Sequence, residues 1–291
     1  MMAKIAWIGT GVMGASMAKH LLRNGHEVNM YSKTIAKAEK VREEEGGVVS
    51  DSIKDAVQNA DYVFTIVGYP SDVEEVYLGQ EGIFNNARNG TLCVDMTTSK
   101  PSLAKILYDE GRRKGIRMLD APVSGGDMGA RNATLSIMVG GDKEDFEEIL
   151  PLLEYLGKNI VYLGSAGSGQ HTKAANQIAI AGATAAMTEA IVYAKRVGLD
   201  PEKMLMAIGA GAAGSWQLSN MAPRVLKGDL GPGFFIKHFI KDMKIVQDEM
   251  LERGVELKML DSVLGLYQEM AAKGFEDDGT QALIKLYEAS E

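Results

Sequence analysis

The first candidate for chemistry is a lysine at the head of a long apolar segment. Ser168 is a candidate helix cap, and the turns after it carry Gln170, His171, Lys173, Asn176 and Gln177. In a helix, Lys173 lies on the same face as Asn176 and Gln177. Because the segment beyond them is apolar, we expect Lys173 to be partly desolvated, with a lowered pKa that suits proton transfer. From spacing alone, a lysine that extends from the helix start into water fits equally well.

A second candidate is the turn that follows Asp120-Ala121-Pro122. Ser124, Gly125 and Gly126 place a hydroxyl beside two glycines, so backbone N–H groups are left uncovered for an anion. Taken alone, these residues also fit an ordinary tight turn.

A glycine pattern near the start indicates a dinucleotide site. The residues Gly9, Thr10, Gly11, Val12, Met13 and Gly14 fit G-x-G-x-x-G between an expected strand and an expected helix. The first glycine permits a tight turn, the second lets a pyrophosphate approach, and the third allows close packing of helix on strand. A purely structural glycine turn is the alternative. Together with the two segments above, the loop indicates an enzyme that holds a dinucleotide and a small anionic substrate.

The end of the second expected strand bears on the ribose of that cofactor. An NAD site usually has an acidic residue there, but this chain has Ser32, Lys33 and Thr34, with no acid between Val28 and Ala38. A lysine attracts a 2′-phosphate that a carboxylate would repel. We therefore predict that NADP(H) is preferred and NAD(H) possible; a solvated Lys33 on a turn is the alternative.

The fold that positions these segments is indicated by strands and helices that alternate along the chain. Expected strands are Lys4–Ile8, Glu27–Tyr31, Tyr62–Val67, Leu92–Met96, Arg117–Ala121, Ser136–Gly140 and Asn159–Leu163. Expected helices between them are Gly14–Asn24, Ile35–Glu45, Ile53–Asn59, Pro101–Lys114 and Lys143–Leu156. Such alternation predicts an α/β, Rossmann-type, doubly wound sheet.

The pattern changes near residues 164–168. One long helix is expected over Ser168–Val197, followed by Pro201–Ala210, Trp216–Val225, Ile236–Arg253, Lys258–Lys273 and Gln281–Ala289. We predict a dinucleotide-binding Rossmann domain over residues 1–164 and an all-α substrate and oligomerisation domain over 165–291, which starts with the long central helix.

Composition excludes several classes of function. The net charge of −8 disfavours nucleic-acid binding. The single cysteine, Cys93, lies in an apolar run, and the four histidines show no metal-ligand spacing, so no metal site is predicted. With neither a signal peptide nor a long uninterrupted apolar run in the sequence, a cytoplasmic protein without membrane contact is expected.

Four motifs in order resemble the β-hydroxyacid dehydrogenases, the family of 3-hydroxyisobutyrate dehydrogenase and tartronate semialdehyde reductase. They are residues 8–14, residues 120–126, residues 167–173 with Asn176, and Lys241-Asp242. The resemblance covers essentially the whole chain. It implies a Rossmann domain followed by an all-α domain, and a homodimer or homotetramer.

The resemblance also implies roles for individual residues. Lys173 matches the catalytic acid/base, and Asn176 matches an amide that holds the substrate. Ser124, Gly125 and Gly126 match the loop that takes the substrate carboxylate. Thr98 matches a threonine beside the nicotinamide, Lys241 a lysine near the cofactor, and Val67 begins the segment expected under the cofactor. Here Thr97 replaces a serine, and Val67-Gly68-Tyr69-Pro70 replaces a Leu-Pro turn.

The expected reaction is therefore NAD(P)-dependent hydride transfer between a small β-hydroxy acid and its semialdehyde. A nucleotide-sensing module without catalysis is an alternative, but such a module has no need of Lys173, Asn176 and Ser124. An imine reductase on the same architecture is another, and Lys173 disfavours it because those enzymes usually lack a lysine there.

Overall fold

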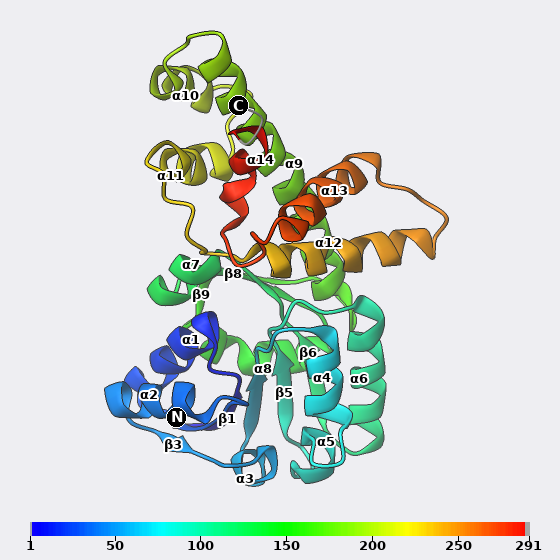
Figure 1. The fold of residues 1–291 in the computed structure, drawn as a ribbon. Helices are drawn as coiled ribbons and strands as arrows, with labels where there is room; N and C mark the ends of the chain where they lie inside the picture. Colours follow the sequence, from blue (N-terminus) through cyan, green and yellow to red (C-terminus); the bar gives the residue numbers. More distant parts are fainter. Residues whose placement is uncertain (1, 289–291) are drawn as a thin grey trace. The chain divides into compact units, whose positions relative to one another are not determined.

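The computed structural model describes residues 2–288. The chain divides into two compact units, Met1–Lys173 and Ala174–Glu291 (Figure 1).

The first unit is built on a six-stranded parallel sheet with the order β3-β2-β1-β4-β5-β6. Its strands are β1 (Lys4–Ile8), β2 (Glu27–Tyr31), β3 (Val48–Val49), β4 (Tyr62–Thr65), β5 (Leu92–Asp95) and β6 (Arg117–Asp120). Helices of this unit are α1 (Val12–Arg23), α2 (Ile35–Glu45), α3 (Ile53–Val57), α4 (Pro70–Leu78), α5 (Ile83–Asn86), α6 (Pro101–Arg113), α7 (Gly126–Asn132) and α8 (Lys143–Leu153). A smaller sheet contains β7 (Val123–Ser124), β8 (Leu135–Val139) and β9 (Gly157–Tyr162).

Side-chain alternation along β1 explains why helices are needed on both faces of the large sheet. Ile5 and Trp7 belong to one apolar cluster, and Ala6 and Ile8 belong to another. Four consecutive buried apolar residues in a strand, here Ile5–Ile8, require that both faces of the strand are covered, as in doubly wound sheets.

The second unit is helical. The long helix α9 (Ser168–Arg196) begins in the first unit and is followed by α10 (Pro201–Gly209), a π-helical segment (Gln217–Met221), α11 (Ala222–Leu226), α12 (Ile236–Leu251), α13 (Lys258–Ala272), a 3₁₀ segment (Thr280–Ile284) and α14 (Lys285–Glu288). Phe239 of α12 packs edge-on against Tyr267 of α13, with ring centroids 5.1 Å apart, in the core of this unit. By length and composition alone α9 could also cross a membrane, a test that core helices of globular proteins pass as well.

The predicted fold class is confirmed, and most differences are local. Five short elements were not predicted: the two-residue strands β3 and β7 and the helices α4, α5 and α7. The helix predicted over Trp216–Val225 is a π-helical segment followed by α11, and the one predicted over Gln281–Ala289 starts as a 3₁₀ turn. Its last predicted residue, Ala289, lies outside the described residues.

Candidate functional site

The glycine loop joins β1 to α1, and two of its three glycines leave no room for a side chain. Gly9 has φ +105°, its N–H donates to the Tyr31 carbonyl at 2.8 Å, and a Cβ there would lie 2.2 Å from the Ile66 carbonyl oxygen. A Cβ on Gly14 would lie 2.1 Å from the Gly9 carbonyl oxygen, so helix and strand are packed too closely for a side chain. Gly11 is different, since a Cβ there would meet nothing within 4 Å. The open side of the loop is therefore at Gly11.

This arrangement fits a dinucleotide. Gly11 is the residue before the first turn of α1, whose N–H groups and dipole favour an anion such as a pyrophosphate. Thr10 is buried, so its side chain faces the protein interior, whereas Val12 is 63% exposed and Met13 is half-buried. Around Gly11 the loop offers backbone rather than hydroxyl groups to a ligand.

The predicted ribose residues follow β2. Ser32 is buried and Thr34 precedes the first residue of α2. Lys33 is exposed, and its ammonium group lies 2.7 Å from Oε2 of Glu75 and 3.0 Å from Oδ1 of Asp72, both on α4. The hydrogen bonds that the Lys33 ammonium group donates to Glu75 and Asp72 raise the pKa of Lys33. The sequence has no acid between Val28 and Ala38; the two acids beside Lys33 come from α4, a helix that was not predicted.

The ends of β4 and β5 are joined by a buried polar network. The Val67 N–H donates to Oγ1 of Thr97 at 3.0 Å, and the Thr97 N–H donates to Oδ1 of Asp95 at 3.1 Å. The Thr65 hydroxyl donates to the same carboxylate oxygen at 2.7 Å. Burial raises the pKa of Asp95 to about 6. Thr98, predicted to lie beside the nicotinamide, follows directly and is half-buried.

The start of α9 is held by a residue distant in sequence. Ser168 is the first helical residue, so the cap role predicted for it is wrong. The carboxylate of Asp120, at the end of β6, accepts from the N–H of Gly167 at 2.7 Å and from the N–H of Gln170 at 2.9 Å. Burial raises the pKa of Asp120, while these backbone hydrogen bonds act in the opposite direction. Asp120 therefore caps the N-terminus of α9, because its carboxylate accepts from backbone N–H groups that have no partner within the helix.

Gln170 joins the same turn of α9 to the segment after β5. Its side-chain amide donates to the Thr97 carbonyl at 2.7 Å and accepts from the Ser99 N–H at 2.9 Å. Gln170 is 2% exposed, so water does not compete for these bonds. The two residues that flank Thr98 are thus fixed to α9.

Lys173 lies three residues beyond Gln170 and is only 6% exposed. A solvated lysine at the helix start, which the sequence left open, is therefore wrong. A lysine so deeply buried needs partners or loses its charge readily.

The predicted substrate loop lies at the start of the smaller sheet. Ser124 ends β7, where it pairs with Ser136 of β8. Gly125 and Gly126 have φ of +130° and +63°, in the region that favours glycine, and Gly126 begins α7. The backbone therefore turns sharply here, and Ser124 remains half-buried.

In the second unit, the predicted site residues form one chain of contacts between α9 and α12. The Asn176 amide donates to Oε1 of Gln177 at 2.7 Å, and the Gln177 amide donates to Oδ2 of Asp242 at 2.6 Å. Lys241 is paired with Oδ1 of Asp242 at 3.1 Å. Asn176 and Lys241, 65 positions apart in sequence, are thus connected through Gln177 and the buried Asp242.

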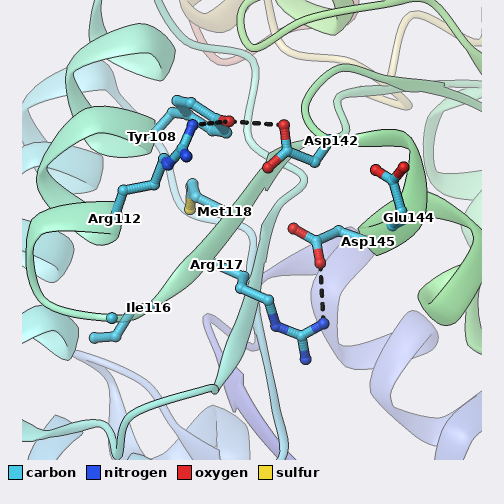
Figure 2. Close-up of a pocket in the computed structure, with 9 residues that line it drawn as sticks. Tyr108, Arg112, Ile116, Arg117, Met118, Asp142, Glu144 and Asp145 are labelled. Atoms are coloured by element: carbon cyan, nitrogen blue, oxygen red, sulfur yellow. Dashed lines mark hydrogen bonds and ion pairs between the residues drawn. The ribbon is translucent and has the colours of Figure 1, made fainter.

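A polar cavity of about 280 Å³ lies elsewhere in the first unit, between α6, β6 and α8 (Figure 2). Its wall includes Tyr108, whose hydroxyl donates to Asp142 at 2.7 Å, and Arg117, which pairs with Asp145 at 2.9 Å. None of the predicted site residues lines it. Residues 2–288 contain no group of three or more His, Cys, Asp or Glu side chains that could hold a metal ion.

Comparison with known proteins gives matches over nearly the whole chain. Residues 4–164 match the family model for the NAD binding domain of 6-phosphogluconate dehydrogenase. Residues 167–287 match the model described as NAD-binding of NADP-dependent 3-hydroxyisobutyrate dehydrogenase.

Individual relatives agree with these matches. The uncharacterized oxidoreductase YkwC of Bacillus subtilis (strain 168) is 53% identical, over 97% of this chain and 98% of that protein. The 2-hydroxy-3-oxopropionate reductase of Escherichia coli (strain K12) is 35% identical, over 98% of this chain and 97% of that protein. The 3-hydroxyisobutyrate dehydrogenase of Mycobacterium tuberculosis, solved with L-serine, has a TM-score of 0.90 at 30% identity and covers 99% of both chains. An imine reductase from Pseudomonas sp., with a TM-score of 0.65 at 18% identity, shares the fold alone.

Proposed function

Because the chain belongs to the 3-hydroxyisobutyrate dehydrogenase family of NAD-binding oxidoreductases, we propose that it interconverts a small β-hydroxy acid and its semialdehyde, with Lys173 as the acid/base. The observation that carries this proposal is the burial of Lys173 at the head of α9. The same helix turn is bonded through Gln170 to the segment that contains Thr98.

Hydride transfer to or from the substrate carbon requires that one proton is added to or removed from the substrate oxygen. When bound, the nicotinamide supplies or accepts the hydride at the adjacent carbon. In the reducing direction, Lys173 as an ammonium ion donates a proton to the oxygen as negative charge develops there. In the oxidising direction, neutral Lys173 removes the hydroxyl proton. Burial favours both tasks, because a nearby group interacts more strongly with the charge that develops on the substrate oxygen where water is excluded.

The remaining predicted residues would hold the two reactants. The backbone N–H groups of Gly125 and Gly126, with the Ser124 hydroxyl, would suit a carboxylate. Asn176, one helical turn beyond Lys173, offers an amide to the substrate. Thr98 and Val67 would line the nicotinamide end of the cofactor. Lys241, on α12, is the lysine that we propose near the cofactor.

The substrate class is supported by the chemistry of the relatives' ligands. 2-Hydroxy-3-oxopropionate is a short semialdehyde with a carboxylate. L-serine, present in the Mycobacterium tuberculosis structure, is a β-hydroxy acid. We propose 3-hydroxyisobutyrate and tartronate semialdehyde as substrates of this class, and two other short oxo acids, succinic semialdehyde and glyoxylate, as further candidates.

For the cofactor we propose that NADP(H) is preferred and NAD(H) is also accepted. Lys33 is the cation that would meet the 2′-phosphate. A Lys33→Asp variant should then lose far more affinity for NADPH than for NADH, and equal losses would refute this role of Lys33.

The reaction class can be tested with a substrate panel. Purified protein is assayed for NADPH and NADH oxidation with short semialdehydes, glyoxylate and a cyclic imine. We expect turnover of at least one semialdehyde and none of the imine. Turnover of the imine without any aldehyde would favour the imine reductase alternative, and cofactor binding without turnover of any carbonyl would favour the sensing module.

A further inference from the structure

Two carboxylates beside Lys33 bear on the choice of cofactor. Lys33 contacts Glu75 at 2.7 Å and Asp72 at 3.0 Å, so one positive charge is matched by two negative charges. Asp72 is also fixed to its own helix, because its Oδ2 accepts from the Tyr69 N–H at 3.0 Å. Glu75 is less constrained, with its side chain 65% exposed.

The ion pairs extend from one side of the glycine loop to the other. β2 and β4 are the two neighbours of β1 in the sheet. Lys33 follows β2, and α4 with both carboxylates follows β4. The loop is bonded to each side, since the Gly9 N–H donates to Tyr31 at 2.8 Å and Ile8 accepts from the Ile66 N–H at 3.0 Å. In this fold the cofactor ribose is recognised at the end of β2, where Lys33 stands.

We propose that Glu75 and Asp72 set the cofactor preference of this chain, because they compete with the 2′-phosphate of NADP(H) for the Lys33 ammonium group. The inference rests on the proposed binding of a nicotinamide cofactor at the glycine loop. A 2′-phosphate carries close to two negative charges, so it must displace the carboxylates and is repelled by them. NAD(H) has a neutral hydroxyl at that position and meets neither penalty. The pair therefore reduces the preference for NADP(H) that Lys33 alone would give.

Glu75 is the residue to change first, since Asp72 has a second role at the start of α4. A Glu75→Gln variant removes one negative charge and keeps the side-chain shape. Glu74→Gln is the matched control, because Glu74 is an exposed acid on the same helix for which no contact with Lys33 is found. Dissociation constants for NADPH and NADH are measured by fluorescence titration of the whole protein, without substrate.

We expect Glu75→Gln to tighten NADPH binding about three- to tenfold, as removal of one unit charge a few ångströms away predicts, and to change NADH binding less than twofold. Glu74→Gln should change both less than twofold. Unchanged NADPH affinity in Glu75→Gln, equal gains for both cofactors, or the same gain in Glu74→Gln would overturn the proposal. Because no substrate is present, such a failure leaves the reaction and the role of Lys173 untouched. If the parent protein binds neither NADPH nor NADH, the proposed function itself is wrong.

Discussion

The side-chain amide of Gln170 donates a 2.7 Å hydrogen bond to the backbone carbonyl of Thr97, 73 positions earlier in the sequence. The same amide accepts from Ser99 at 2.9 Å. One buried side chain thus fixes both neighbours of Thr98 to the helix turn that precedes Lys173. We infer that Gln170 is a positioning residue for these two groups.

A Gln170→Met variant should therefore be less stable and slower. It leaves the Thr97 carbonyl and the Ser99 N–H buried without partners, which costs about 1–3 kcal/mol in the free energy of unfolding. Urea unfolding and steady-state turnover measure the two effects. Gln80→Met, at an exposed position on the same unit, should stay within about 0.5 kcal/mol of the parent. The positioning role is wrong if Gln170→Met keeps both parental stability and parental turnover.

Gly11 and Gly14 of the loop should respond differently to substitution by alanine. Gly11→Ala meets open space, so we expect normal stability and weakened cofactor binding, because the new methyl group would occupy the approach of the pyrophosphate. Gly14→Ala would place its Cβ 2.1 Å from the Gly9 carbonyl oxygen and should destabilise the first unit. Thermal unfolding and cofactor titration separate the two outcomes. Tight cofactor binding by a folded Gly11→Ala protein would contradict the assignment of the open side of the loop.

Asp95 should make the stability of the first unit depend on pH. Burial raises its folded-state pKa from 3.8 to about 6. A raised pKa means that the folded protein binds the proton more tightly than the unfolded chain does. This contribution is fully present below pH 3.8 and is lost as the pH rises through 6. The loss is at most about 3 kcal/mol, at 1.4 kcal/mol per pKa unit.

An Asp95→Asn variant should lack this dependence, so the stability of the parent relative to the variant should fall between pH 4 and 6. Trp7, buried and stacked on Phe64 at 5.5 Å, reports on the first unit. Because the chain has two tryptophans, a Trp216→Phe background makes that signal specific. A difference that stays constant across the range would show that Asp95 does not titrate there.

Regular elements of the fold were predictable because their signals are local. Consecutive residues were enough to predict β1 from its apolar run, the glycine loop from its motif and α9 from its composition. The strands β3 and β7 have two residues each, too few for any periodicity, and α4 begins at a proline in a segment that reads as a turn.

Long-range contacts at the candidate site were not predictable in the same way. Ser168 has the right residue type for a cap, yet the carboxylate that serves α9 belongs to Asp120, 48 positions earlier. Likewise, the residues around Lys33 in the sequence do not predict its ion pairs with Asp72 and Glu75. Such partners depend on which strands are neighbours, which a single sequence does not specify at this level of detail.

The measurement that tests the central claim most directly is the single-turnover rate of hydride transfer in Lys173→Ala, followed by NADPH absorbance with the best aldehyde of the panel. We expect NADPH affinity within twofold of the parent and a rate about 10²- to 10⁴-fold lower, the usual contribution of a positioned acid/base. Lys143→Ala, at an exposed lysine on α8, should leave the rate unchanged. A Lys173→Ala protein that binds NADPH normally and transfers hydride within tenfold of the parental rate would contradict the assignment of Lys173 as the proton carrier.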